Sequence, residues 1–240
     1  MDYRKKLGFI YLGFFVLMIL ANYLTGSNVG NVADQNESFI QPAGYVFSIW
    51  GLIYILVFIW IIRLFFTHYE GVYERVNYWL VGNFLLNALW IFVFTQEWLL
   101  VSNLVIIGLL VTLIIIFKKL SKVQGHWFDR FPFSIYLGWV TVATIVNIVT
   151  WVVGNGIEEL FGLNEYHWTL ILLVIATALA VYIAIKYLDW VYPLVFVWAF
   201  SGIIVENEND LMLLMVVAAL GIVTQLGASL YVGAKMRKTT

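Results

Sequence analysis

The chain has 240 residues, of which 63% are apolar or aromatic and 11% are charged, and its mean hydropathy is +0.93. A water-soluble domain carries about 25% charged residues, so this composition excludes an ordinary soluble globule and places the chain in a lipid bilayer. The net charge of −1 argues neither for a nucleic-acid partner nor for an acidic substrate. The absence of cysteine excludes disulfides, iron–sulfur clusters and thiol nucleophiles.

The distribution of apolar residues predicts an all-α integral membrane protein with eight transmembrane helices. A helix that crosses a membrane needs about 20 predominantly apolar residues. The third and fourth stretches are separated by three residues, and the seventh is short, so either neighbouring pair could instead form one long bent helix. The predicted spans are residues 7–24, 44–66, 76–94, 98–117, 132–153, 167–188, 190–205 and 211–233.

The basic residues predict how these spans are oriented. Lys and Arg in short loops are retained on the cytoplasmic side of a membrane, whereas acidic residues have little influence. If the N-terminus is cytoplasmic, all 13 basic residues fall in cytoplasmic loops or tails. All the charged residues of the outer loops are then acidic. Deleting or fusing any span before the last would move basic residues to the outer face. The pattern therefore predicts eight spans with the N- and C-termini both cytoplasmic.

The predicted membrane interior contains no charged residue. A charge at the centre of a bilayer costs on the order of 2.5–3.5 kcal/mol and is kept for a purpose such as proton relay, so its absence argues against a pump, a proton-coupled transporter or a voltage sensor. His68, His126 and His167 fall at loop or interface positions, where a solvated histidine is favoured over a metal or haem ligand. The sequence therefore predicts no catalytic residue, no metal site and no required cofactor.

Aromatic and amide residues recur at helical spacing in three predicted helices. Steps of three or four residues place them on one helix face, and three such faces turned toward one another would line an apolar cavity with a few polar anchors. In an alternative interpretation the asparagines only join helices, through hydrogen bonds of about 0.6 kcal/mol that rarely exceed about 1.7 kcal/mol. Spacing alone favours the cavity and this alternative equally. The residues are Phe47, Trp50 and Tyr54; Asn83, Asn87, Trp90 and Phe94; and Tyr136, Trp139, Ala143, Asn147 and Trp151.

Three further features have a structural interpretation beside a functional one. The loop at about residues 25–43 is either a lid or a slack connector. An alanine ladder in the sixth helix permits close backbone approach and favours packing within the chain, with a homodimer contact as the alternative. Tryptophans near helix ends are expected to anchor the protein at the membrane interface. The ladder is Ala176, Ala180 and Ala184, and the anchors are Trp79, Trp98, Trp127, Trp168 and Trp190.

Three motifs in successive helices resemble those of one family. Residues 42–54, PAGYVFSIWGLIY, are similar to Pro-x-Trp-Val-x-Gly-Pro-x-Trp-x-x-x-Tyr, and residues 86–90, LNALW, to Leu-Asn-x-x-Trp. Residues 136–147, YLGWVTVATIVN, followed by Trp151, are similar to Tyr-Leu-x-Trp-x-x-x-Ala-Thr-x-x-Asn with a downstream Trp. Together they resemble the TspO/MBR family, whose members are also called tryptophan-rich sensory proteins or translocator proteins.

The resemblance covers residues 1–153, which would form the family's five-helix transmembrane domain, with residues 154–240 as a three-helix C-terminal extension. It implies a cavity enclosed by the first, second and fifth helices, covered by the first loop, that accepts tetrapyrroles such as protoporphyrin or haem, and sterols in some members. Large flat rings would stack on tryptophan faces there. On this carry-over the site is lined by Trp50, Tyr54, Asn87, Trp90, Trp139, Ala143 and Asn147, and the helix-face pattern adds Tyr136 and Trp151.

The sequence also departs from the family pattern. Gly44 stands where the family has tryptophan, Phe47 and Ser48 replace its Gly-Pro, and Ile91 and Phe92 replace a proline pair. These changes predict a remodelled cavity mouth. The three additional helices could occlude the cavity, form a second one or replace the family's dimer contact.

The function predicted from the sequence is a membrane receptor, sensor or carrier for an apolar ring ligand. Its expected partners are the lipid bilayer and that hydrophobic small molecule, and no nucleic acid. One alternative is an intramembrane enzyme that degrades a porphyrin or rearranges an isoprenoid. Another is a facilitative transporter of a hydrophobic small molecule.

Overall fold

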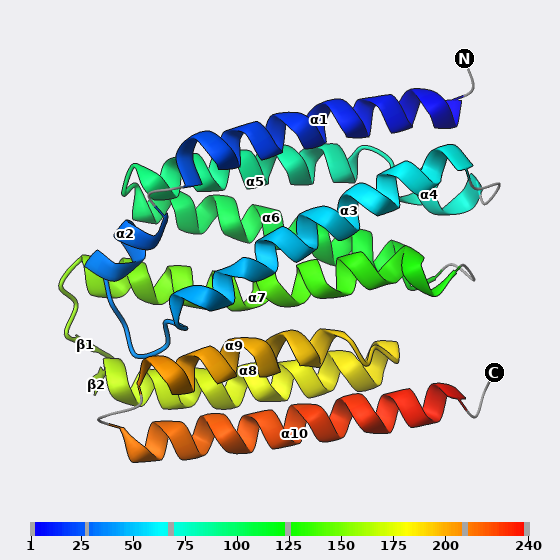
Figure 1. Ribbon diagram of the computed structural model, residues 1–240. Coiled ribbons are helices and arrows are strands. Elements are labelled where there is room, and N and C mark those ends of the chain that lie inside the picture. The colour runs from blue at the N-terminus through cyan, green and yellow to red at the C-terminus, as the bar shows by residue number, and fades with distance from the viewer. Residues whose placement is uncertain (1–2, 27–28, 67–69, 123–125, 208–210, 238–240) are drawn as a thin grey trace. The chain divides into compact units, whose positions relative to one another are not determined.

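The computed structural model describes residues 3–26, 29–66, 70–122, 126–207 and 211–237. The regular secondary structure of this part of the chain is helical apart from one two-stranded hairpin, and the chain divides into two compact units (Figure 1). The first unit contains Met1–Val32 and Ile49–Val140, and the second contains Ala33–Ser48 and Thr141–Thr240. The division falls inside one long helix, whereas the predicted domain boundary at 153/154 falls at the end of that helix.

The first unit is a bundle of apolar helices. Helix α1 packs against α3, α4 and α5, and α6 packs against α5 and α4. The first half of α7 completes the unit through aromatic contacts and hydrogen bonds described below, and the short helix α2 (Val29–Gln35) begins in it. The bounds are α1 Tyr3–Thr25, α3 Ile49–Phe66, α4 Glu70–Val76, α5 Trp79–Thr95, α6 Leu99–Leu120 and α7 Trp127–Gly154.

Helices α5 and α6 are separate helices that pack against each other, not one bent helix. Glu97 adopts the left-handed backbone conformation with φ of 59°. Its N–H donates to the carbonyl of Phe94, and the N–H of Trp98 donates to the carbonyl of Val93. This pair of hydrogen bonds is a Schellman motif, which ends a helix by satisfying its last carbonyl groups. The three polar residues between the apolar stretches are therefore long enough to reverse the chain.

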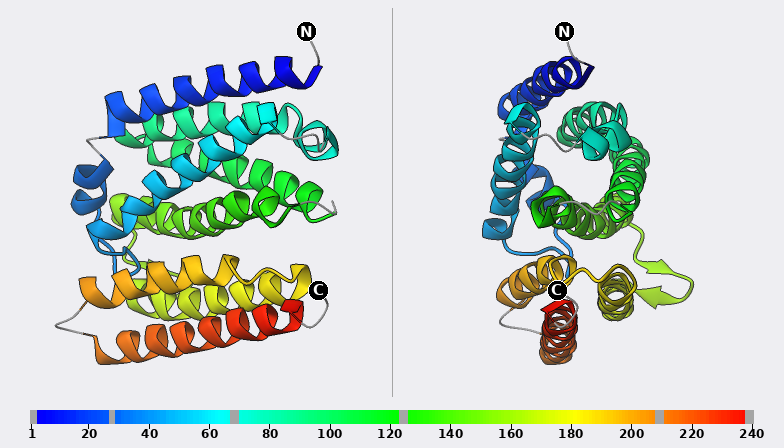
Figure 2. Two further views of the ribbon diagram at one scale, coloured as in Figure 1. Left: turned by 45° about the vertical axis from the view of Figure 1, so that its right-hand side comes forward. Right: turned by 90° about the vertical axis from the view of Figure 1, so that its right-hand side faces the viewer.

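The second unit is built on three helices that pack pairwise (Figures 1 and 2). The alanine ladder of α8 is buried within this unit, with Ala180 and Ala184 fully inaccessible, which agrees with the favoured packing interpretation. A 3₁₀ helix, η2, lies against α9. The bounds are η2 Gly44–Ser48, α8 Glu165–Tyr187, α9 Tyr192–Glu206 and α10 Met212–Arg237.

The turn between α8 and α9 also separates two helices. Leu188 has φ of 49°, and its N–H donates to the carbonyl of Ala184 at the end of α8. Asp189 is buried, and its Oδ1 accepts hydrogen bonds from the N–H groups of Val191 and Tyr192 at 2.9 and 3.0 Å. A carboxylate at a helix N-terminus satisfies unpaired N–H groups and interacts favourably with the helix dipole. The short seventh apolar stretch is thus a helix of its own.

A β-hairpin between α7 and α8 was not predicted from the sequence. Strands β1 (Glu159–Leu160) and β2 (Leu163–Asn164) pair in antiparallel fashion. Phe161 and Gly162, the two residues of the turn, have φ of 55° and 75°, as a type I′ turn requires. With two residues in each strand, the hairpin has too little periodicity for a strand to be recognised in the sequence.

Six helices among the described residues are long and apolar enough to cross a membrane: α1, η2 with α3, α6, α7, α8 and α10. Helices α5 and α9 are apolar but shorter, with 17 and 15 residues. At 1.5 Å per residue they extend about 25 and about 23 Å, against a hydrocarbon core of about 30 Å. The chain is therefore a multi-pass integral membrane protein.

Candidate ligand-binding site

An aromatic cluster in the first unit is centred on Trp50, in the first turn of α3. Its ring centroid lies 5.7 Å from that of Tyr54, 5.8 Å from Trp90, 5.9 Å from Tyr136 and 6.2 Å from Trp139. The Tyr136 and Trp139 rings meet Trp50 edge to face, the geometry that the quadrupoles of aromatic rings favour. Six of the nine predicted site residues, counting Asn87, thus lie together in this cluster.

A chain of hydrogen bonds runs through the cluster from α3 to α7. The hydroxyl of Tyr54 donates to Oδ1 of Asn22 at 2.8 Å, and Nδ2 of Asn22 donates to Oδ1 of Asn87 at 2.9 Å. Nδ2 of Asn87 then donates to the hydroxyl oxygen of Tyr136 at 2.9 Å. Asn87 and Tyr136 are buried, with exposed fractions of 0% and 1%. Each buried amide therefore has a partner, which removes most of the cost of placing it in an apolar interior.

The two asparagines of α5 have different roles, although they are one helical turn apart. Nδ2 of Asn83 donates to Oγ1 of Thr112 in α6 at 2.9 Å, and Oδ1 of Asn83 is buried without a hydrogen-bond partner. Asn83 therefore joins two helices, as the alternative interpretation of the helix-face pattern predicts. Asn87 also joins helices, but it does so inside the aromatic cluster.

The rings of the cluster contact one another directly. A flat ring inserted between two parallel rings needs about 3.5 Å on each side, or about 7 Å in total, and all four separations from Trp50 are shorter. Trp50 and Tyr54 are partly exposed, whereas Trp90 and Trp139 are buried. A ligand would have to lie against the accessible side of Trp50 or displace its side chain.

The remaining predicted site residues continue along α7. Ala143, Asn147 and Trp151 follow Trp139 at intervals of four residues on the same continuous helix. Asn147 is buried, and Ala143 and Trp151 are partly exposed. All three belong to the second compact unit, so their assignment to the site stays a prediction.

Asn22 is a member of the cluster that the sequence analysis missed. It lies in the last turns of α1 and accepts a hydrogen bond from Tyr54 while donating to Asn87 and to the carbonyl of Met18. It is an amide within an apolar stretch, which was the available signal, because such a group needs a partner in the membrane. The motif resemblance drew attention to three other helices instead.

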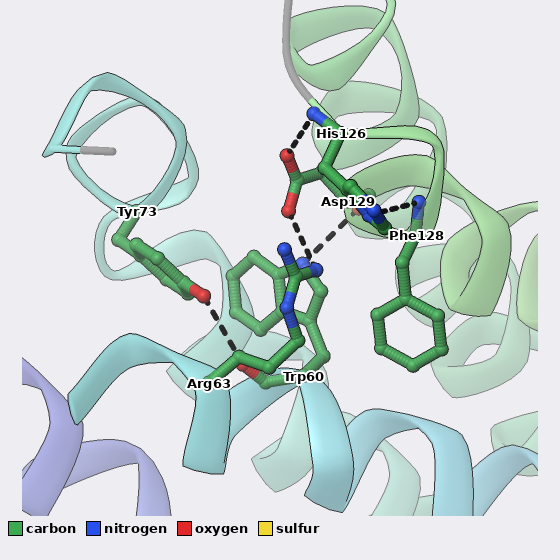
Figure 3. A network of polar contacts seen from close by, with 6 residues as sticks. All are labelled: Trp60, Arg63, Tyr73, His126, Phe128 and Asp129. Atoms are coloured by element: carbon green, nitrogen blue, oxygen red, sulfur yellow. Dashed lines mark hydrogen bonds and ion pairs between the residues drawn. The ribbon is translucent and has the colours of Figure 1, made fainter. Parts of the chain in front are cut away.

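A second polar network in the first unit joins α3, α4 and α7 (Figure 3). Oδ1 of Asp129 forms an ion pair with Nη1 of Arg63 at 3.0 Å, and the backbone carbonyl of Asp129 accepts a hydrogen bond from Nε1 of Trp60 at 3.1 Å. The hydroxyl of Tyr73 donates to the carbonyl of Trp60 at 3.3 Å. The guanidinium of Arg63 also lies 5.2 Å from the ring centre of Phe128. This network fixes the start of α7, the helix that positions Tyr136 and Trp139.

Asp129 and His126 also form a reciprocal cap at the start of α7. Oδ2 of Asp129 accepts a hydrogen bond from the N–H of His126 at 2.8 Å, and Nδ1 of His126 accepts one from the N–H of Phe128 at 3.2 Å. This arrangement is similar to a capping box, except that the histidine ring accepts from the N–H two residues on instead of three. Of the other two histidines, His167 contacts Asn164 at the N-terminus of α8, and His68 lies outside the described residues.

Burial raises the pKa of the Tyr73 hydroxyl above its usual range, and the positive charge of Arg63 opposes this effect. Tyr73 lies in α4, outside the candidate membrane spans. It therefore stays neutral under ordinary conditions and acts as a hydrogen-bond donor to the carbonyl of Trp60.

The predicted lid or connector is partly helical and partly pinned to the second unit. Residues 38–48, here called the strap, pack against α8 and α9. Nε1 of Trp198 donates to the carbonyl of Val46 at 3.0 Å, and the N–H of Ala43 donates to the carbonyl of Gly202 at 3.2 Å. The N–H of Phe39 donates to Oε1 of Glu165 at 2.7 Å. The strap is thus held by hydrogen bonds along its length, so it is not a slack connector.

Gly202 explains how closely the strap approaches α9. A Cβ atom at this position would overlap the side chain of Val46 and lie 3.0 Å from Cβ of Pro42. Val46 and Ala43 are buried, with exposed fractions of 0% and 7%. Only glycine leaves room for this contact, and the strap is joined directly to α3, two residues before Trp50.

These features define a multi-pass helical membrane protein with a buried cluster of indole, phenol and carboxamide groups. The sequence model of the family described as "TSPO-like protein" matches residues 7–231. The chain belongs to this TSPO-like family, which confirms the resemblance. The match extends beyond residue 153 into all three C-terminal helices, farther than the motifs alone indicated. No curated protein and no solved structure matches the chain.

Proposed function

We propose that the protein is a membrane receptor, sensor or carrier that binds an apolar ring ligand, such as a tetrapyrrole, at the aromatic cluster around Trp50. The TSPO-like family supports a ligand-binding or sensory role for the protein. The observation that carries the proposal is the hydrogen-bond chain from Tyr54 to Tyr136, both of whose end rings contact Trp50.

The direction of the hydrogen bonds supplies a polar anchor for the ligand. Each member of the chain donates to the next, and Tyr136 accepts from Asn87 at the end. Among the described residues no acceptor is recorded for the hydroxyl hydrogen of Tyr136 itself. A tyrosine hydroxyl can donate one hydrogen bond while accepting another. Tyr136 is therefore the group that would donate to a carbonyl or carboxylate oxygen of the ligand.

Trp50 is the group that would respond to the ligand. It contacts four rings and is still partly exposed, while Trp90 and Trp139 behind it are buried. A flat ligand that stacks on Trp50, or takes its place, would meet aromatic faces at little polar cost.

Quenching of tryptophan fluorescence tests the proposal. We expect saturable quenching when the purified protein is titrated with protoporphyrin, and weaker effects with a sterol or a carotenoid. Trp50→Ala should weaken protoporphyrin binding at least tenfold, and Ala143→Phe should abolish it if α7 lines the same site. The matched control is Trp98→Phe, since Trp98 is 55% exposed and lies at a helix end. Equal affinity in Trp50→Ala and Trp98→Phe would overturn the proposal.

The same titration separates binding from the enzymatic and transport alternatives. After long incubation with the protein, a receptor or carrier leaves protoporphyrin chemically unchanged, as checked by chromatography and mass spectrometry. Loss of the ligand with formation of a product that depends on Trp139 would indicate an intramembrane enzyme. Flux of the ligand into liposomes would separate a facilitative transporter from a closed receptor.

We also propose that eight helices span the membrane with both termini cytoplasmic. Basic residues in the last turns of α3, α6, α8 and α10 support this, because each would then lie at the inner face. The chain has no cysteine, so single introduced cysteines report topology without background. Glu37→Cys and Asn155→Cys should react with an impermeant maleimide on intact cells, and Lys235→Cys should react only after permeabilisation. Labelling of Lys235→Cys on intact cells would refute this topology.

A further inference from the structure

The second unit contains an apolar groove that shares no residue with the aromatic cluster. It has a volume of about 730 Å³ and runs between the start of α9 and the last turns of α10. A volume of this size is within the range of about 300–1,000 Å³ that small-molecule sites occupy. Its walls include Trp190, Leu194, Leu226, Leu230, Gly233 and Arg237.

The floor and the open side of the groove are set by specific residues. The hydroxyl of Ser229 is part-buried and donates to the carbonyl of Trp190 at 2.6 Å, which holds the start of α9 against α10. Apart from its chain neighbours and the backbone of its own helix, no heavy atom lies within 4 Å of the position that a Cβ atom would take at Gly233. Leu230 is 74% exposed. The groove therefore has a floor held by a hydrogen bond and an open, apolar side.

The end of the groove is basic. Arg237 forms part of its wall, and Lys235 lies in the same last turn of α10. The acidic residue just before α9, Asp189, is buried and accepts hydrogen bonds from the first N–H groups of α9. The basic side chains at the groove end lie in the last turn of α10.

We propose that this groove binds an anionic phospholipid, with one acyl chain in the apolar hollow and the phosphate group at Arg237. Basic side chains at the end of an apolar site in a membrane protein are the recognised chemistry for anionic headgroups. The apolar walls alone would accept the acyl chain of any lipid. The positive end of the groove is what selects an anionic headgroup over a zwitterionic one.

Binding of two phospholipids with the same labelled acyl chain tests the proposal. The full-length protein in detergent is titrated with phosphatidylglycerol or phosphatidylcholine carrying a fluorophore on one tail, and binding is followed by anisotropy. We expect phosphatidylglycerol to bind at least fivefold more tightly. Arg237→Gln should weaken phosphatidylglycerol about fivefold and leave phosphatidylcholine unchanged, because one phosphate contact is lost.

A second variant tests the hollow itself. Gly233→Trp should fill the groove and weaken both phospholipids more than tenfold. Gly227→Trp is the matched control, because Gly227 lies on the same helix, also has open space at its Cβ position and is not part of the groove wall. Both variants should retain wild-type affinity for protoporphyrin, so this inference can fail without the proposed function failing.

Three results would overturn the inference. The first is equal affinity for the two phospholipids, and the second is wild-type phospholipid binding by Gly233→Trp. The third is stronger displacement of the labelled lipid by an uncharged sterol than by unlabelled phosphatidylglycerol. If Gly233→Trp does not fold, the exposed Arg237→Gln substitution still decides the outcome.

Discussion

The aromatic cluster and the strap are both held by hydrogen bonds, but they use different partners. In the cluster, side chains bond to side chains, as in the pairs of Asn22 with Asn87 and of Asn87 with Tyr136. In the strap, the hydrogen bonds to α8 and α9 use backbone groups, as in the bonds of Trp198 to the carbonyl of Val46 and of the Ala43 N–H to the carbonyl of Gly202. The cluster is therefore specified by polar side chains, and the strap by shape and backbone geometry.

This difference teaches that the two regions should fail in different ways. Removing one side chain from the cluster leaves a buried polar partner without a hydrogen bond. Adding bulk at the strap forces buried groups apart, because a close-packed interface cannot absorb extra atoms. The following predictions are ordered from the largest expected effect to the smallest.

Gly202→Leu should have the largest effect, because its side chain would overlap Val46 and Pro42. We expect a loss of about 3 kcal/mol in unfolding free energy, the upper end of the usual cost of overpacking. Thermal unfolding in detergent and protease sensitivity of residues 38–48 would measure it. Gly227→Leu, at a position with open space, should leave both unchanged. A stable Gly202→Leu variant with a protected strap would contradict the steric account.

Asn87→Leu should lower the unfolding free energy by about 2 kcal/mol and weaken protoporphyrin binding. It leaves Asn22 and Tyr136 with one hydrogen bond fewer each, and an unpaired buried polar group costs about 1–3 kcal/mol. Thermal unfolding and fluorescence quenching report the two effects separately.

Asn83→Leu is the matched comparison on the same helix. Oδ1 of Asn83 already lacks a partner, and Thr112 still donates to the carbonyl of Leu109 after the change. We therefore expect a change within about 0.5 kcal/mol and wild-type ligand affinity. Equal losses in Asn83→Leu and Asn87→Leu would remove the distinction between a helix-joining amide and a cluster amide.

Trp198→Phe should have a moderate effect on the strap. It removes the hydrogen bond to the carbonyl of Val46 and keeps an aromatic ring against Tyr45. The expected loss is about 1 kcal/mol, the usual net worth of one hydrogen bond. Faster hydrogen exchange in the 3₁₀ helix η2, with unchanged exchange in α3, would support the assignment. Unchanged exchange in η2 would show that the indole N–H does not hold the strap.

Tyr73→Phe should have an effect similar in size to that of Trp198→Phe, and one that depends on pH. Its pKa is raised in the folded protein, so its contribution to stability is complete below the unfolded pKa of about 10 and is lost as pH rises further. The wild type should exceed Tyr73→Phe in stability by about 1 kcal/mol at pH 8, and this difference should shrink above pH 10. A difference that stays constant to pH 11 would contradict the burial effect.

The sequence predicted the helices well because their cause is local. Long apolar stretches in lipid must form helices, since every backbone polar group needs a partner. The sequence left open whether the third and seventh apolar stretches are separate helices. The structure separates them by turns in which Glu97 and Leu188 adopt the left-handed conformation, which is uncommon for these residue types. The predicted boundary at residue 153 and the number of spans stay predictions.

The candidate site was predictable in part, through the helical spacing of Trp50, Tyr54, Asn87 and Tyr136. Asn22 was not found, because its partners Tyr54 and Asn87 lie 32 and 65 residues away in the sequence. No local pattern indicates contacts at such separations. The strap on α9 was not found either. It depends on the absence of a side chain at Gly202, which carries no signal in an apolar helix. The helical spacing did not distinguish Asn83 from Asn87, because the neighbouring helices determine the partner of each amide.

Light-driven oxidation by bound protoporphyrin tests most directly whether the ligand lies at the aromatic cluster. Illuminated porphyrin generates short-lived oxidants that attack the nearest tryptophans, and peptide mass spectrometry locates the oxidised residues. We predict oxidation first at Trp50, and reduced oxidation there in Asn87→Leu but not in Asn83→Leu. Oxidation confined to exposed interfacial tryptophans such as Trp98 and Trp127, or equal at all sites, would contradict the account.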